Sequence, residues 1–265
     1  MYLSVKNASF SYGKKTILED IEFSIVQGGI FCLLGPNGTG KSTLLDCIMG
    51  VQKLKKGSIS IKGESIGKLP PRELARLISY VPQVQTVSFP FEVIQMVLMG
   101  RTAYLSFFSS PGLEDYRIAE EALTLVGMTE HKHRIFTELS GGEKQLVMIA
   151  RALAQKTSMI IMDEPTAHLD VKNEFVVLET ITKLAQNMKL TFLIATHFPN
   201  HPFYFADHSI PTTVGILNKK RFSYLGTPQE VLKESNIYEV FGVKTKVLTY
   251  QIEEEQYSYV LPLQT

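Results

Sequence analysis

The sequence predicts an α/β fold with a mainly parallel sheet, a small N-terminal antiparallel β subdomain and an inserted helical subdomain. Short, wholly apolar runs of strand length recur between stretches with helical periodicity, which is typical of a parallel sheet. Residues 2–10 and 17–25 alternate apolar and polar side chains, as half-buried antiparallel strands do. Residues 84–137 show helical periodicity and no evident strand, which indicates the helical insertion.

The composition is that of a globular protein, with 265 residues, 45% of them hydrophobic and 20% charged. The formal net charge of +1 argues against general binding to nucleic acid or acidic surfaces. Cys32 and Cys47 are interpreted as small buried hydrophobes, which fits a reducing compartment. His131 and His133 are better explained as part of a solvated loop than as a metal site, because no cysteine or clustered carboxylate completes a ligand set.

We expect neither a signal peptide nor a membrane span. The first residues lack the charged start and apolar centre of a signal peptide. No apolar run approaches the roughly 18 residues that a membrane-spanning helix requires. Any action at a membrane would therefore pass through a partner protein.

One stretch matches the phosphate-binding pattern G-x-x-x-x-G-K-[ST] without a gap, between a strand-like run at 30–34 and a helix-like run at 43–49. Glycines let the backbone approach a phosphate closely, and the amides at a helix start attract anions. Lys41 would reach the β- and γ-phosphates, and the Ser42 hydroxyl would ligate Mg²⁺. The pattern therefore predicts the nucleotide site of a P-loop NTPase. Its residues are Gly35, Pro36, Asn37, Gly38, Thr39, Gly40, Lys41, Ser42 and Thr43.

A second apolar run, at 159–162, ends in the carboxylates Asp163 and Glu164. A phosphate loop needs an acidic residue at a strand end near the metal, so Asp163 is the candidate Mg²⁺ ligand. Glu164 could orient and deprotonate the attacking water. A solvated acidic turn is the alternative, and the phosphate loop makes it the weaker explanation.

Three further residues are candidates of lower specificity. Gln83 and His197 each follow a strand-like run, and open α/β sheets bind ligands at the carboxyl ends of their strands. Tyr12 could stack on an adenine ring, because aromatic faces accept bases. A turn tyrosine or a lone histidine is more often structural, so these residues carry little weight alone.

The stretch 139–143 begins a further helix. Ser140 suits an N-cap, and Gly141 and Gly142 would leave a notch of bare amide groups large enough for an anion. This second notch has no lysine equivalent to Lys41, and simple capping would also explain it. Its occurrence together with the phosphate loop makes it informative.

Taken in this order, the phosphate loop, the 139–143 stretch and the 159–165 run resemble the nucleotide-binding subunit of an ATP-binding cassette (ABC) transporter. The resemblance covers about residues 3–233. It implies a dimer of two copies that sandwiches two ATP molecules, with Mg²⁺. Each ATP would lie between the Lys41 loop of one copy and Ser140, Gly141 and Gly142 of the other. It also implies that Tyr12 stacks on adenine, Gln83 senses the γ-phosphate and the metal, Glu164 is the catalytic base, Asp170 lies in the cross-interface loop, and His197 is the switch histidine.

Details at 71–75, 81–83, 97–101 and 166–170 are closest to importer subunits for iron chelates, haem and vitamin B12, and molybdate importers share them. The resemblance implies an ATPase on the cytoplasmic face of the cell membrane, bound to a transmembrane permease and indirectly to a substrate-binding protein. The apolar segment 84–101 would receive a coupling helix of the permease, although buried core explains its character equally well. We expect a single ATPase domain over 1–233, with a helical subdomain at about 84–140, and a C-terminal extension over 234–265.

Two other functions compete with import. A soluble ABC ATPase that acts on nucleic acid or ribosomes usually has two cassettes in one chain or long coiled coils, and this sequence shows neither. A non-hydrolysing regulatory cassette is disfavoured by Glu164 and His197. Glu143 and Ala167 depart from the more usual Gln and Ser, and 201–213 is unusual for the family, so an altered surface is expected there.

Overall fold

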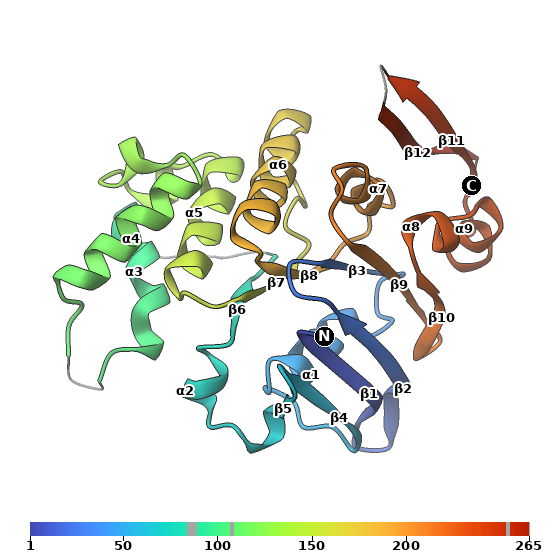
Figure 1. Ribbon diagram of the computed structural model, residues 1–265, viewed down its shortest axis with the longest axis horizontal. Coiled ribbons are helices and arrows are strands. Elements are labelled where there is room, and N and C mark those ends of the chain that lie inside the picture. Colours follow the sequence, from blue (N-terminus) through green and yellow to red (C-terminus); the bar gives the residue numbers. More distant parts are fainter. Residues whose placement is uncertain (84–88, 107–108, 253–254, 265) are drawn as a thin grey trace. The chain divides into compact units, whose positions relative to one another are not determined.

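The computed structural model describes residues 1–83, 89–106, 109–252 and 255–264 (Figure 1). The chain forms two compact units. The first unit comprises Met1–Leu69 and Thr182–Thr265, and the second comprises Pro70–Ile181.

The first unit contains the predicted antiparallel sheet. Its strands β1 (Leu3–Tyr12), β2 (Lys15–Ile25), β4 (Lys56–Ile61) and β5 (Glu64–Ser65) lie in the order β2-β1-β4-β5 (Figure 1). The predicted alternation along the first two strands is confirmed, because their inward side chains are buried.

Strand β4 begins at Lys56 and has a glycine as its second residue. Gly57 has a φ of +85°, and a Cβ there would overlap the backbone of Lys6 and Asn7. The pairing with β1 shifts register between Lys6 and Ser9. The glycine therefore marks a β-bulge. A bulge of this kind favours glycine just as a turn does, so the two look alike in sequence.

The first unit also contains parallel strands, two of which are buried throughout. Strand β3 (Ile30–Leu34) pairs in parallel with β8 (Thr191–Ala195) and with β9 (Thr212–Asn218). Strand β10 (Arg221–Gly226) adds to β9 in antiparallel fashion. Every residue of β3 and β8 is buried, which explains why both are wholly apolar or nearly so in sequence. Helix α1 (Lys41–Ile48) follows β3, and α7 (Asn200–Asp207) follows β8.

The C-terminal part of the first unit is ordered into helices and a hairpin. Helices α8 (Pro228–Val231) and α9 (Glu234–Phe241) precede β11 (Lys244–Ile252), which pairs with β12 (Glu255–Gln264). These last two strands form a β-hairpin within the C-terminal extension. The sequence analysis did not predict α9, nor α7 in the unusual segment that follows His197.

The second unit contains the predicted helices around one parallel pair of strands, β6 (Ile78–Val81) and β7 (Met159–Asp163). Its helices are α2 (Pro71–Leu74), α3 (Val93–Leu98), α4 (Leu113–Leu125) and α5 (Gly141–Ala154), and α6 (Val171–Met188) begins in this unit. Helix α5 packs against α3 and α4, with Leu146, Ile149, Ala150 and Leu153 buried. In the part of the chain that the structure describes, no helix has the length and apolar character needed to cross a membrane.

Candidate functional site

The predicted phosphate loop runs from the end of β3 to the start of α1 and lies close to neighbouring strands. Gly35 has a φ of +152°, and a Cβ there would overlap the carbonyl oxygen of Leu217 in β9. Gly40 has a φ of +107°, and its Cβ would lie 2.9 Å from Cγ2 of Ile17 in β2. Both positions therefore require glycine, because any side chain would push the loop away from the strands.

The side chain of Lys41 folds over this loop and is only 7% exposed. Its Nζ donates to the carbonyl oxygens of Gly35 at 2.7 Å and Pro36 at 3.3 Å. Thr39 Oγ1 also donates to the Pro36 carbonyl, at 2.9 Å. The side chains of Thr39 and Lys41 therefore both fix the backbone of the loop. The N-cap of α1 is Gly40, which offers no side-chain cap, and the first turn of α1 has no acidic residue. A glycine-lined loop at such a helix start fits a phosphate group.

His197 lies at the carboxyl ends of the parallel strands, as this loop does. Strands β3 and β8 are parallel neighbours, with Leu33 opposite Ala195. Thr196 N donates to the Leu33 carbonyl at 3.0 Å, which ties the end of β8 to the residues just before Gly35. The side chain of His197 is exposed, and its ring lies 4.0 Å from the ring of Phe198.

Tyr12 is the last residue of β1, rather than part of the turn that the sequence suggested. Its side chain is 50% exposed, and its ring meets the ring of Phe10 edge-on at 4.8 Å. Tyr12 pairs with Lys15 of β2, the strand whose Ile17 lies against the phosphate loop. An exposed aromatic face on this sheet is available to a flat ring.

In the second unit, the parallel pairing of β6 with β7 brings Gln83 to Glu164. Val81 and Met162 are opposite each other, so the residues that follow the two strands emerge together. Gln83 Nε2 donates to Glu164 Oε2 at 2.9 Å. Asp163 ends β7 and is 9% exposed, whereas Glu164 has a φ of +48°, an uncommon conformation for a residue with a side chain. The chain therefore turns sharply between the two carboxylates.

The start of α5 is capped as the sequence predicts. Glu143 N donates to Ser140 Oγ at 3.3 Å, and Ser140 N donates to Glu143 Oε2 at 2.8 Å, a reciprocal capping box. The backbone hydrogen bond from Ser140 lowers the pKa of Glu143 below its ordinary value. Ser140 and Gly141 are exposed and Gly142 is buried, so the amide notch opens to solvent at one side.

Asn173 links this notch to Asp170, and the sequence analysis did not identify it. A Cβ on Gly142 would overlap the side chain of Asn173. Asp170 accepts from Asn173 N at 2.8 Å and from Asn173 Nδ2 at 2.9 Å. The signal in sequence was an acidic residue just before α6 with a polar residue three positions later, the spacing of a helix cap.

The structure thus arranges the predicted residues in three groups. In the first unit, the phosphate loop and His197 both follow the carboxyl ends of parallel strands. In the second unit, Asp163 ends β7, while Gln83 and Glu164 follow β6 and β7 and bond to each other. Asn173 lies against Gly142 in the notch of Ser140, Gly141 and Gly142, and bonds to Asp170. Within the described ranges, no group of three or more His, Cys, Asp or Glu side chains could hold a metal ion.

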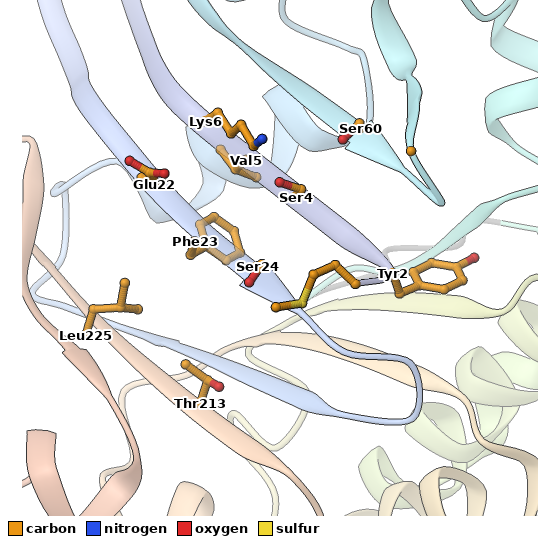
Figure 2. Close-up of a pocket in the computed structure, with 12 residues that line it drawn as sticks. Tyr2, Ser4, Val5, Lys6, Glu22, Phe23, Ser24, Ser60, Thr213 and Leu225 are labelled. Carbon is orange, nitrogen blue, oxygen red and sulfur yellow. The ribbon is translucent and has the colours of Figure 1, made fainter.

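A separate hollow lies over the antiparallel sheet, with a volume of about 760 Å³ (Figure 2). Ser4, Lys6, Glu22 and Ser24 line it from β1 and β2. It contains none of the predicted site residues.

Comparisons with known proteins bear on the family of this chain. Residues 18–167 match the family model for the ABC transporter. The molybdate import ATP-binding protein of Haemophilus influenzae is 34% identical over 262 residues, which cover 98% of this chain and 96% of that protein. An ATP-binding protein assigned to iron chelatin transport in Helicobacter pylori is 37% identical over 229 residues, covering 86% of this chain and 88% of that protein.

Among solved structures, one chain of an inward-facing ABC transporter assigned to the metal-chelate type is 33% identical. The likeness has a TM-score of 0.86 and covers 99% of this chain and 97% of that one. Because a family model matches more than half of the sequence and relatives match nearly all of it, the chain belongs to the ABC transporter family and is one of its ATP-binding, ATPase subunits.

Proposed function

We propose that this chain hydrolyses ATP to energise the uptake of a metal chelate, of the iron-siderophore, haem or cobalamin type, through a partner permease. The observation that carries the proposal is the likeness along almost the whole chain to a subunit of a metal-chelate type transporter. That likeness extends beyond the ATPase core into the C-terminal residues. The relative assigned to iron chelatin transport supports the same substrate class.

The residues present fit ATP with Mg²⁺. The loop from Gly35 to Lys41 is shaped for a phosphate, and its lysine and helix end supply positive charge. Ser42, Gln83 and Asp163 would offer a hydroxyl, an amide and a carboxylate oxygen, the hard donors that Mg²⁺ prefers. When bound, the magnesium nucleotide supplies the phosphoryl group to be transferred to water.

The roles of this chain's own residues in hydrolysis follow from their positions. Glu164 accepts the proton of the attacking water, and Gln83 holds its carboxylate in place through Nε2. Lys41 and the first turn of α1 stabilise negative charge on the phosphate oxygens. His197 contacts the γ-phosphate, and Tyr12 stacks on the adenine.

A second copy of the chain would complete each nucleotide site. Gly141 and Gly142 present their backbone amides in a notch that opens to solvent at one side, and the notch has no lysine equivalent to Lys41. A phosphate carried by the partner's loop supplies the missing partner for these amides. Asp170 would lie in the same interface, held against the notch by Asn173.

In this arrangement residues 1–233 form one ATPase domain, with the helical subdomain at about 84–140. Residues 234–265 form a C-terminal extension. The subunit sits on the cytoplasmic face of the cell membrane through the permease. A substrate-binding protein delivers the chelate, and nucleic acid has no part. The predicted permease-docking segment 84–101 lies partly outside the described residues.

Molybdate is the second candidate substrate, because the Haemophilus influenzae molybdate relative matches this chain over nearly its full length. We expect an importer of an oxyanion and an importer of a chelate to differ in the permease and the binding protein, rather than in the ATPase subunit. The discriminating experiment must therefore include those partners.

The test begins with a tagged pull-down from detergent-solubilised membranes, followed by mass spectrometry. The recovered permease is then reconstituted in vesicles with this subunit and its binding protein. Uptake and ATP hydrolysis are measured with ferric siderophore, haem, cobalamin and molybdate. Stimulation by one chelate, lost in Glu164→Gln, is the expected result. Stimulation by molybdate alone would show that molybdate, and not a chelate, is the transported substrate. Recovery of ribosomes without a permease would overturn the proposed role in import.

A further inference from the structure

A small cluster surrounds the ring of Phe198, directly after β8. We call Thr196, His197, Phe198 and His201 the β8 cluster. The ring of Phe198 lies 4.0 Å from that of His197, at an angle of 37°, and 5.0 Å from that of His201, at 42°. One aromatic ring therefore contacts both the predicted switch histidine and a second histidine four residues later.

Thr196 holds this cluster together through hydrogen bonds. Its Oγ1 accepts from Phe198 N at 3.1 Å and lies 3.1 Å from Nδ1 of His201. Its backbone N–H donates to Leu33, so the same residue is fixed to the end of β3. Thr196 is 1% exposed and His201 is 2% exposed. A buried imidazole that meets a buried hydroxyl forms a directional bond, which a purely apolar core would lack.

Helix α7, which carries His201, is braced by the C-terminal hairpin (Figure 1). The side chain of Asn200 accepts from Val260 N at 2.7 Å and donates to Val260 O at 3.3 Å. At the other end of the helix, Asp207 accepts from Ser258 N at 3.2 Å. Strand β12 thus fixes the helix at two points about two turns apart, and His201 is adjacent to one of them.

We propose that His201 is a positioning residue for His197, acting through Thr196 and Phe198. The inference rests on the proposed function and deepens it. The ring of His197 is exposed and contacts the ring of Phe198. The bond between His201 and Thr196 sets the path of the chain through Phe198, and the Phe198 ring sets the orientation of the His197 ring. Small misplacements of a phosphate contact cost large factors in rate.

The test compares two substitutions of His201 in the reconstituted complex. His201→Phe keeps a ring of similar size but removes the bond to Thr196, and we expect kcat for ATP hydrolysis to fall about tenfold. The KM for ATP should stay within about twofold, because the phosphate loop is untouched. His201→Asn places an amide near the position of Nδ1, so kcat should recover to within about threefold of the unsubstituted protein.

The matched control is His208→Phe. His208 caps the same helix, and its Nδ1 lies 2.7 Å from the carbonyl oxygen of Tyr204 rather than near Thr196. This variant should keep kcat unchanged. If His201→Phe does not fold, Thr196→Val against Thr196→Ser tests the same bond from its other side, because only the serine retains the hydroxyl. An equal loss of kcat in His208→Phe, or no difference between the paired variants, would overturn the proposal.

A double-mutant cycle separates positioning from general stability. If His201 acts through His197, His201→Phe should change kcat by less than about twofold in a His197→Ala background. An equal fall in both backgrounds would show a merely structural role. If His197→Ala itself leaves kcat unchanged, the assignment of His197 in the proposed function fails together with this inference. If His197→Ala lowers kcat and His201→Phe does not, only the positioning role is lost.

Discussion

Gln83 and Glu164 are joined by a hydrogen bond of 2.9 Å, in which the amide nitrogen after β6 donates to the carboxylate after β7. This bond uses Nε2 of Gln83 and leaves its side-chain oxygen directed elsewhere. The one amide can therefore hold the predicted base with its nitrogen while its oxygen ligates Mg²⁺. The two predicted roles of Gln83, as sensor and as metal ligand, are compatible in a single side-chain orientation.

Replacing Glu164 with glutamine should stop hydrolysis without stopping binding. The amide cannot accept the proton of the water, so turnover should fall by about 10²–10⁴-fold. ATP affinity should persist, and the ATP-bound dimer should accumulate, as measured by light scattering with single-turnover assays. Glu130→Gln, an exposed carboxylate in the same unit, is the control. Turnover at the unsubstituted rate would remove Glu164 from the reaction, and a monomer at saturating ATP in the presence of the permease would contradict the sandwich.

Lys41→Ala should abolish nucleotide binding or hydrolysis. The substitution removes the ammonium that bonds to Gly35 and Pro36, and with it both charge and closure of the loop. Calorimetric titration with ATP and a steady-state phosphate assay measure the two effects. Lys53→Ala, which removes an exposed lysine outside the loop, should leave both unchanged. Near-normal ATPase activity in Lys41→Ala would refute the site assignment.

Gly142→Ala should damage both packing and hydrolysis. The added methyl group overlaps Asn173, so we expect a loss of about 1–3 kcal/mol in the free energy of unfolding. Displacing Asn173 also moves Asp170, which accepts two of its hydrogen bonds, and ATP hydrolysis should fall. Gly112→Ala is the control for stability, since a Cβ there meets nothing within 4 Å. If the two variants have the same free energy of unfolding in urea, the close fit of Gly142 against Asn173 is contradicted.

Glu143→Gln should make stability less sensitive to acid. Hydrogen bonds from Ser140 lower the pKa of Glu143 in the folded state. Its contribution to stability is therefore present above the unfolded-state pKa and is lost as the pH falls through the folded value. At pH 7 the variant should be less stable by at most about 1 kcal/mol, because glutamine still accepts from Ser140 N. Urea unfolding at pH 7 and near pH 4 measures the slope, with Glu138→Gln as the control, and an unchanged slope would exclude Glu143 as a source of acid sensitivity.

Asn200→Ala should loosen α7 and β12 together. The substitution leaves both backbone groups of Val260 without their present partner, which costs about 1–3 kcal/mol. Hydrogen exchange should rise in both elements and stay unchanged in α1. Asn236→Ala is the control of smaller effect, because it removes one bond to the Val231 carbonyl and one from the neighbouring Ser235 hydroxyl, and neither lies in α7 or β12. Faster exchange confined to β12 would show that the hairpin does not brace the helix.

The elements found most accurately from sequence were those whose residues all obey one local rule. Strand β3 matches the predicted run at 30–34 to the residue, because a buried parallel strand is a short apolar run bounded by polar or special residues. The N-cap at Ser140 was likewise predicted correctly, whereas its reciprocal bond with Glu143 appeared only in the structure. Helix α7 was missed because its sequence contains a histidine and a proline, and its buried Phe203 and Phe205 depend on tertiary packing.

By itself, the sequence determined the phosphate loop, the strand-end carboxylates and the helix caps, since these are consequences of a few consecutive residues. Only the tertiary structure decided which distant residues touch. The bond from Gln83 to Glu164 spans 81 positions and depends on the register of β6 against β7. The contacts of Asn173 with Gly142 and of Asn200 with Val260 likewise depend on how helices pack. Backbone conformation follows from local chemistry, whereas pairing between side chains follows from strand register and packing, which no local pattern encodes.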